Sequence, residues 1–222
     1  MLKTVNVPPH FEAIFANAEE VVGKYFSDIK YTPTKGVITI DNDRYILMRG
    51  ESIFFNLKES LNDQFGEEVT NKFLYELAKT IGKSDAVKFA EKMNLKDPIQ
   101  KLSAGPVHFS HAGWGFVNIF PESSPTPDEN YFLLYEHPNT FESELTIKYS
   151  KKVTKPVCVF SAGYSAGWSS HSFNLELDAK EISCVAKGDP TCLFIMSPAN
   201  MIDRRIEEYL KKIVTGQVPG KF

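Results

Sequence analysis

Several common functional signals are absent from this 222-residue sequence. It contains neither the glycine-rich phosphate loop of P-loop proteins nor the glycine pattern of dinucleotide-binding folds. No apolar run is long enough to span a membrane, and the N-terminal residues lack the apolar core of a signal peptide. Basic residues are not in excess, because 25 Lys and Arg face 28 Asp and Glu, whereas a nucleic-acid-binding surface requires a clustered basic face. We therefore expect a soluble cytoplasmic protein that neither spans a membrane nor contacts nucleic acid directly.

Cysteine is scarce, with only Cys158, Cys184 and Cys192 and no CxxC pair. An odd number of cysteines fits a reducing cytoplasm better than a disulfide framework. Cys184 and Cys192 flank a Gly-Asp-Pro turn between two β-rich runs, so a hairpin would bring their thiols together. With Cys158 and Glu181 they would form a four-ligand structural zinc site. Two alternatives are three buried free thiols that pack as small hydrophobes, and a disulfide between Cys184 and Cys192.

The pattern of apolar residues predicts one compact α+β domain. Residues 8–26 carry an apolar stripe at helical spacing, which fits either a helix packed on the domain or a dimerisation helix. Residues 36–48 are typical of a hairpin. Gly163 and Gly167 give the helix after Pro156 a small face that allows another element to approach closely. We expect a mixed or antiparallel sheet flanked by helices, with a zinc-stapled hairpin near the C-terminus.

The remaining elements follow from hydrophobic spacing and from glycine as a helix breaker. Gly82 is expected to separate two helices, and residues 99–112 are expected to be transitional. Helices are predicted over 53–65, 67–81, 84–93, from 139 onward and over 201–214, and strands over 113–120, 131–135, 181–185 and 192–196.

Aromatic and histidine side chains gather between residues 108 and 173. Aromatic walls with a few polar groups suit a small apolar or aromatic ligand, whose hydroxyl a ring nitrogen could hold. An ordinary aromatic core would give the same composition. No spacing ties a histidine and an acid to a serine nucleophile, so we assign no catalytic residue and do not expect an enzyme. The candidate ligand-binding residues are His108, Phe109, Trp114, Phe132, His137, Tyr164 and Trp168.

Two stretches carry a family resemblance. GYSAGWSS (163–170) and KEISCVAKGDPTCLFIMSP (180–198) resemble the vinyl-reductase domain. GVITIDNDRYILMRGES (36–52), followed by helices, resembles the N-terminal half of the sensor domain of phenol- and xylene-responsive transcription activators. The resemblance implies a dimeric sensor that binds a small aromatic or hydrophobic ligand and signals to transcription through a downstream protein partner. The alternatives are an enzyme or accessory protein of the vinyl-reductase type, and a scaffold subunit with an acyl-binding pocket.

The resemblance also implies specific site residues. It gives Cys158, Glu181, Cys184 and Cys192 as the ligands of one structural zinc ion. In a regular strand, residues three apart point to opposite faces, so Glu181 needs a bulge to share a metal with Cys184; Glu176 and Asp178 are the substitutes.

For the ligand pocket, the resemblance places His137 where the phenol sensors have a tryptophan. It places His108 or Phe109 at the position of their pocket histidine. The chain then divides into an N-terminal helix for possible dimerisation (1–30), the first part of the sensor-like domain (31–135), a zinc module (136–200), and a C-terminal helix and tail (201–222).

Overall fold

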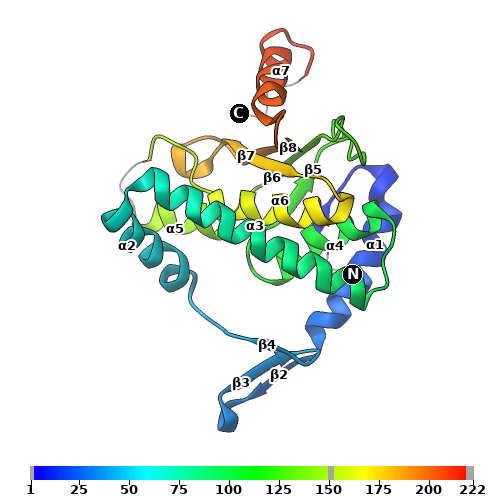
Figure 1. Cartoon of the computed structure of the whole chain (residues 1–222), viewed down its shortest axis with the longest axis vertical. Coiled ribbons are helices and arrows are strands. Elements are labelled where there is room, and N and C mark those ends of the chain that lie inside the picture. Colours follow the sequence, from blue (N-terminus) through cyan, green and yellow to red (C-terminus); the bar gives the residue numbers. More distant parts are fainter. Residues whose placement is uncertain (1–2, 150–152, 219–222) are drawn as a thin grey trace.

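The protein is built around a five-stranded mixed sheet (Figure 1). The computed structural model describes residues 3–149 and 153–218. The strand order is β1-β5-β6-β8-β7; β1 pairs in parallel with β5, and the other pairs are antiparallel. The strands are β1 (Val5–Asn6), β5 (Val117–Ile119), β6 (Leu133–His137), β7 (Leu177–Ser183) and β8 (Cys192–Pro198). The sheet and its flanking helices confirm the predicted α+β class.

Helices cover both faces of this sheet. The main core lies between one face and helices α1 (Glu12–Ser27), α3 (Glu67–Lys92), α4 (Pro98–His111) and α6 (Val159–Phe173). A smaller core lies under α7 (Ile202–Val214) on the other face. Side chains alternate between the faces of a strand, so in β6 Leu133 and Tyr135 join the main core and Leu134 joins the core under α7.

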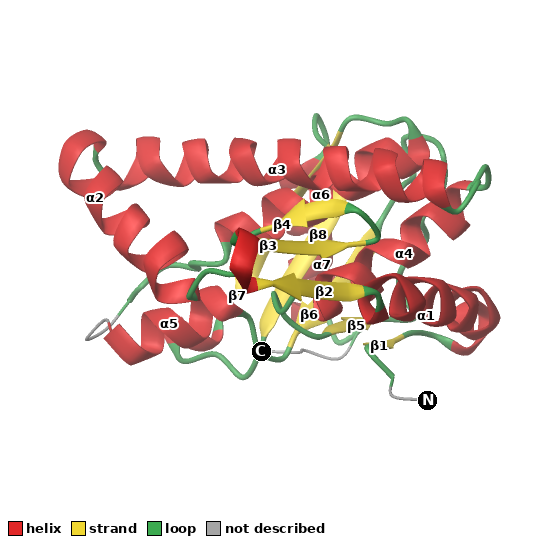
Figure 2. Ribbon diagram, turned by 90° about the horizontal axis from the view of Figure 1, so that it is seen from below, coloured by secondary structure: helices red, strands yellow, loops and turns green. Residues whose placement is uncertain are grey.

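The N-terminal stripe packs on the domain itself. A short 3₁₀ turn (Pro9–Phe11) leads into α1, and Phe15, Ala18 and Val22 of α1 are buried in the main core. In Figure 2, α1 and α4 lie at one end of α3, and α2 (Asn56–Phe65) and α5 (Phe141–Tyr149) lie at the other. Packing within the chain therefore accounts for the buried face of α1, as the first of the two interpretations of residues 8–26 predicts.

The longest helix corrects one expectation. Gly82 was predicted to end a helix, but α3 runs without interruption from Glu67 to Lys92. Gly82 has a packing role, since a Cβ at this position would overlap the backbone of Tyr164 in α6. Gly163 and Gly167 lie as closely against the backbone of Tyr75 and Lys79 in α3. The predicted small face of α6 is therefore confirmed, and it packs against α3.

Residues 99–112 are a second correction, because they form helix α4 rather than a transitional segment. The Asp97 side chain accepts a hydrogen bond from the Gln100 N–H (3.0 Å), and Pro98 occupies the first helical turn. Both are standard signals of a helix start. Both signals, the Asp97 cap and Pro98, could have been recognised in the sequence.

A second, three-stranded sheet projects from the body (Figure 1). It consists of β2 (Ile29–Thr32), β3 (Val37–Ile40) and β4 (Asp43–Tyr45), with a 3₁₀ turn at Pro33–Lys35. The predicted hairpin is present as β3 and β4, but it ends at Tyr45, and β2 was missed. The hydroxyls of Tyr25 and Tyr45 lie 2.8 Å apart and connect this sheet to α1. A π-helical turn (Glu51–Phe55) then leads into α2.

Among the described residues, no helix has the length and apolarity needed to cross a bilayer.

Candidate metal centre and neighbouring cavity

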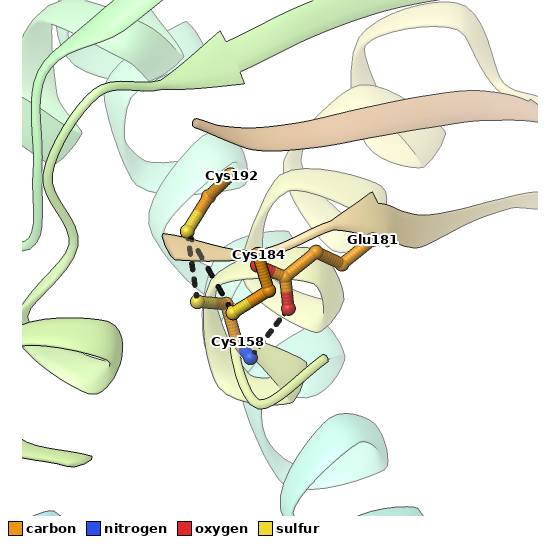
Figure 3. A group of neighbouring side chains, drawn as sticks. All are labelled: Cys158, Glu181, Cys184 and Cys192. Atoms are coloured by element: carbon orange, nitrogen blue, oxygen red, sulfur yellow. Dashed lines mark hydrogen bonds between the residues drawn. The ribbon is translucent and has the colours of Figure 1, made fainter. Parts of the chain in front are cut away.

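The three cysteines and Glu181 converge at one end of the sheet (Figure 3). Cys158 precedes α6, Cys184 follows β7, and Cys192 begins β8. One ligand atom from each of the four residues lies within 4.8 Å of the other three. Figure 3 shows the sulfur atoms and the carboxylate gathered around a common point. The structure thus brings together all four residues predicted as metal ligands.

The spacing of the sulfur atoms fits a tetrahedral zinc ion. The Sγ atom of Cys192 lies 3.7 Å from that of Cys158 and 3.9 Å from that of Cys184. A zinc–sulfur bond of about 2.3 Å implies a sulfur–sulfur separation of about 3.8 Å at tetrahedral angles. A disulfide requires about 2.05 Å, and all three cysteines are free.

A β-bulge brings Glu181 to the cluster. Across the β7–β8 pair, Glu181 lies opposite Phe194 and Ser183 lies opposite Leu193, so Ile182 is an extra residue on β7. This is the irregularity that a shared site for Glu181 and Cys184 requires. The two alternative carboxylate ligands, Glu176 and Asp178, do not join the cluster, because both pair with Lys79.

The turn between β7 and β8 is shaped around the thiols. It contains a 3₁₀ turn (Val185–Lys187) and Gly188, whose φ of 105° favours glycine. The Cys184 N–H donates to the Asp189 carboxylate (2.8 Å), and the Val185 N–H donates to Cys192 Sγ (3.4 Å). An N–H directed at sulfur stabilises a thiolate, which is the form that binds metals.

The electrostatics of the cluster also fit a cation. Glu181 Oε2 accepts a hydrogen bond from the Cys158 N–H (2.8 Å), but Oε1 is buried without a hydrogen-bond partner among the described residues. Burial and the charge of Cys184 raise the pKa of Glu181 to about 9. Hydrogen bonds from the thiols of Cys158 and Cys192 lower the pKa of Cys184 to about 2, whereas burial raises the pKa of Cys158. Buried acidic groups of this kind are costly unless a cation compensates them, so the four residues could hold a metal ion.

Most of the predicted ligand-binding residues also converge, around a small cavity next to the cluster. Phe109, His137, Tyr164 and Trp168 line it. His108 and Trp114 form a second layer, with the Trp114 ring 4.5 Å and the His108 ring 6.3 Å from that of Tyr164. The cavity is therefore aromatic on several sides, as predicted.

Phe132 does not join this group. It precedes Leu133, whose side chain lines the cavity, so it points to the opposite face and packs in the core under α7. Tyr135 does line the cavity and was missed. Its period-two spacing from His137 in a predicted strand was the signal that could have identified it.

His137 lines the cavity and has one ring nitrogen without a hydrogen-bond partner among the described residues. Its Nδ1 lies 3.0 Å from the Phe116 carbonyl oxygen, which can only accept, so Nδ1 carries the proton. Burial lowers the pKa of His137 to about 4, and the ring is therefore neutral near pH 7. Its Nε2 is buried and has no hydrogen-bond partner in the described part of the chain.

His108 does not line this cavity. The Tyr164 hydroxyl lies 2.9 Å from His108 Nδ1 and donates to the Asp85 carboxylate (3.0 Å). Burial lowers the pKa of His108 to about 3. Phe109 lines the cavity, and His108 lies behind Tyr164 in a polar chain.

Sequence comparisons agree with this geometry. A sequence model of the vinyl-reductase domain matches residues 138–198, a range that contains all four residues of the cluster. Residues 138–198 are therefore similar to the vinyl-reductase domain. Residues 26–123, which precede that domain, match a second family model, described as "activator of aromatic catabolism". Comparison with curated proteins gives no match.

Comparison with solved structures also gives similar folds. The chain is similar to the phenol-responsive sensory domain of the transcription activator PoxR, crystallised with phenol, with a TM-score of 0.72 and 19% identity over 91% of this chain and 98% of that one. Weaker similarities are to a trafficking protein particle complex subunit 3 from Naegleria fowleri, covalently bound to palmitic acid (TM-score 0.46, 12% identity, 82% and 95% covered), and to a vinyl-4-reductase family protein from Methanocaldococcus jannaschii (TM-score 0.43, 15% identity, 86% and 95% covered). At this level of identity the likeness to the PoxR domain establishes a shared fold.

Proposed function

We propose that this chain is a zinc-containing sensor module that binds a small aromatic or hydrophobic ligand. In this proposal it is a cytoplasmic homodimer, not an enzyme, and it regulates transcription through a downstream protein partner. Support comes from the two family matches and from the fold shared with a phenol-responsive sensory domain. Residues 31–135 and 136–200 would form the sensor and its metal module. Residues 1–30 would contribute to the dimer, and residues 201–222 would connect to the partner.

Zinc would act as a structural cross-link. Cys158, Glu181, Cys184 and Cys192 would hold it, and they tie the start of α6 to β7 and β8. Four protein ligands leave no open coordination position, which is typical of structural rather than catalytic zinc. The unpaired Oε1 of Glu181 supports its role as the fourth ligand.

The unpaired Nε2 of His137 is the single observation that carries the ligand proposal. A neutral imidazole whose Nδ1–H is already used offers only a lone pair, so the ligand must donate a hydrogen bond. A phenol-type hydroxyl meets that requirement, while its ring packs against Phe109, Tyr164 and Trp168. A carboxylate would place a second acceptor against the lone pair in a cavity without compensating charge, so an anionic acid is disfavoured.

The cavity must widen to admit such a ligand. Its volume is about 30 Å³, enough for one or two water molecules, whereas a cavity of about 150 Å³ accepts benzene. This small volume favours one alternative, a scaffold subunit whose core is filled by its own side chains. The two proposals differ in whether the protein binds an aromatic molecule in solution.

Native mass spectrometry with elemental analysis is the first test of the proposed function. We expect a dimer with one zinc ion per chain. A metal-free, folded monomer would contradict both the zinc and the dimer proposals.

Titration with phenol, toluene and benzoate, followed by calorimetry, tests the ligand. We expect phenol to bind, benzoate to bind at least about tenfold more weakly, and His137→Phe to lose about tenfold in phenol affinity but none for toluene. Phe132→Leu, on the opposite face of the sheet, is the control and should bind phenol as the wild type does. Absence of binding by all three compounds would favour the scaffold.

A further inference from the structure

Residues 137–142 form one short segment that touches both the cavity and the cysteine cluster. His137 ends β6 and lines the cavity, and it is paired with Cys192 across the β6–β8 register. Thr140 and Glu142 follow within five residues, and both are buried. None of the arguments for zinc given above uses these two polar side chains.

Thr140 contacts the sulfur of Cys158 directly. Its hydroxyl oxygen lies 3.1 Å from Cys158 Sγ, and its side chain is 1% exposed. A metal-bound thiolate can only accept hydrogen bonds, so the Thr140 O–H must then donate to it. In the structure the Thr140 hydroxyl accepts a hydrogen bond from the Ser143 N–H (3.0 Å) and donates to Ser143 Oγ (2.9 Å), so its single proton must turn from Ser143 to the sulfur when Cys158 is a metal-bound thiolate.

Glu142 holds the backbone that carries Cys158. Its carboxylate is fully buried and accepts hydrogen bonds from the N–H groups of Phe160 (2.9 Å) and Ser161 (2.7 Å). These groups belong to the first turn of α6, and Cys158 is the N-cap residue of that helix. Thr140 therefore contacts the sulfur, and Glu142 fixes the turn from which the sulfur projects.

The same segment is held against residues 114–115, which lie in the layer behind the cavity wall. Thr140 forms a β-bridge with Gly115, and the Phe141 N–H donates to the carbonyl oxygen of Trp114 (3.0 Å). A Cβ on Gly115 would lie 2.6 Å from the Asn139 carbonyl oxygen, so the two backbones meet without room for a side chain. Thr140 therefore contacts both Cys158 and the backbone next to Trp114, and it lies three residues after His137.

We infer that Thr140 and Glu142 are positioning residues for the metal ligand Cys158, and that residues 137–142 link metal binding to the position of His137. This inference rests on the proposed function, since it requires zinc at the four-residue cluster. Hydrogen-bond partners of metal ligands change metal affinity by about 10- to 100-fold when they are removed.

Metal titration of three threonine variants of the full chain tests the inference. Thr140→Val removes the hydroxyl at nearly constant volume, Thr140→Ser keeps it, and Thr70→Val is the matched control. Thr70 is also buried, and its hydroxyl has no hydrogen-bond partner among the described residues. Zinc affinity is measured by competition with a chelator, and the thiolate-to-cobalt absorption band of the cobalt-loaded protein reports on the sulfur ligands.

We expect Thr140→Val to bind zinc about 10- to 100-fold more weakly and to shift the cobalt band. Thr140→Ser and Thr70→Val should stay close to the wild type in both measurements. Equal zinc affinity for Thr140→Val and the wild type would overturn the role of Thr140, as would an equal loss in Thr140→Val and Thr140→Ser. A wild-type protein that binds neither zinc nor cobalt would instead refute the proposed function.

Nuclear magnetic resonance of the His137 ring tests the link to the cavity. We expect the His137 signals to move when a chelator removes zinc from the wild type, and the signals of the exposed His10 to stay unchanged. Unchanged His137 signals after verified zinc removal would overturn the link. This measurement needs no cavity ligand, so its outcome is independent of the phenol titration.

Discussion

Replacement of Gly167 by alanine tests the close packing of α3 against α6. An added Cβ would lie 2.8 Å from the Lys79 carbonyl carbon and closer still to its oxygen. The carbonyl oxygen, which is the nearer atom, sets the displacement, so restoring an ordinary contact moves the two backbones apart by more than about 1 Å, and a gap of that size forfeits about half or more of each dispersion contact nearby. Overpacking of this kind costs about 1–3 kcal/mol, and the value should be near the upper end because a backbone carbonyl cannot rotate away. Alanine regains up to about 1 kcal/mol of helix propensity, so we expect a net loss of about 2 kcal/mol.

Urea unfolding of the zinc-loaded protein measures this loss, with Gly23→Ala as the matched control. Gly23 also lies inside a helix, α1, but its added Cβ would meet only His111 Nε2 at 3.8 Å, an ordinary contact. Gly23→Ala should therefore be neutral or stabilise the protein by up to about 1 kcal/mol. A Gly167→Ala protein that is as stable as the Gly23→Ala protein would refute the packing argument.

Three further predictions concern the buried polar groups. Cys184→Ser should abolish stoichiometric zinc and cost about 4 kcal/mol or more, or about 8–16 °C in melting temperature; an unchanged melt would rule out a structural metal. Burial holds the pKa of His108 at about 3, against about 6.5 in the unfolded chain. Between these two pKa values the unfolded chain binds a proton at this histidine that the folded protein does not, so the free energy of unfolding falls as the pH falls. Between pH 7.5 and 5 the free energy of unfolding of the wild type should fall by about 2 kcal/mol more than that of His108→Gln. Parallel pH profiles of unfolding for the two proteins would refute the buried neutral state of His108. Glu142→Gln should destabilise the protein at pH 8 by about 1–3 kcal/mol, because one buried N–H of α6 loses its acceptor; equal urea midpoints would contradict the capping role.

The candidate metal site was largely readable from the sequence. The Gly-Asp-Pro turn predicts the hairpin that joins Cys184 to Cys192, and the need for a bulge follows from the spacing of Glu181 and Cys184. The convergence of Cys158 was one of three alternatives on spacing alone and was favoured by the family resemblance, because nothing local connects the start of α6 to the hairpin that follows it. Thr140 and Glu142 had no signal of their own, since their roles depend on contacts made by another helix.

Two of the errors have different physical causes. Gly82 was expected to break a helix on intrinsic propensity, but close packing against Tyr164 makes glycine necessary inside α3. Phe132 was grouped with the cavity by closeness in sequence, whereas strand alternation sends it to the other face. Tertiary packing decides the role of Gly82, and a local pattern cannot show which neighbour will be present, whereas the alternation that places Phe132 could be read from the sequence.

The placement of β6 has a mechanical consequence. The strand is a single layer of backbone between two compartments, with Tyr135 and His137 in the cavity and Leu134 in the core under α7. Anything that widens the cavity by pushing on β6 presses the same strand against the C-terminal helix, without passing through a loop or a hinge. Pressure on one side of the sheet is thus converted into strain at the base of α7, across the thickness of one strand.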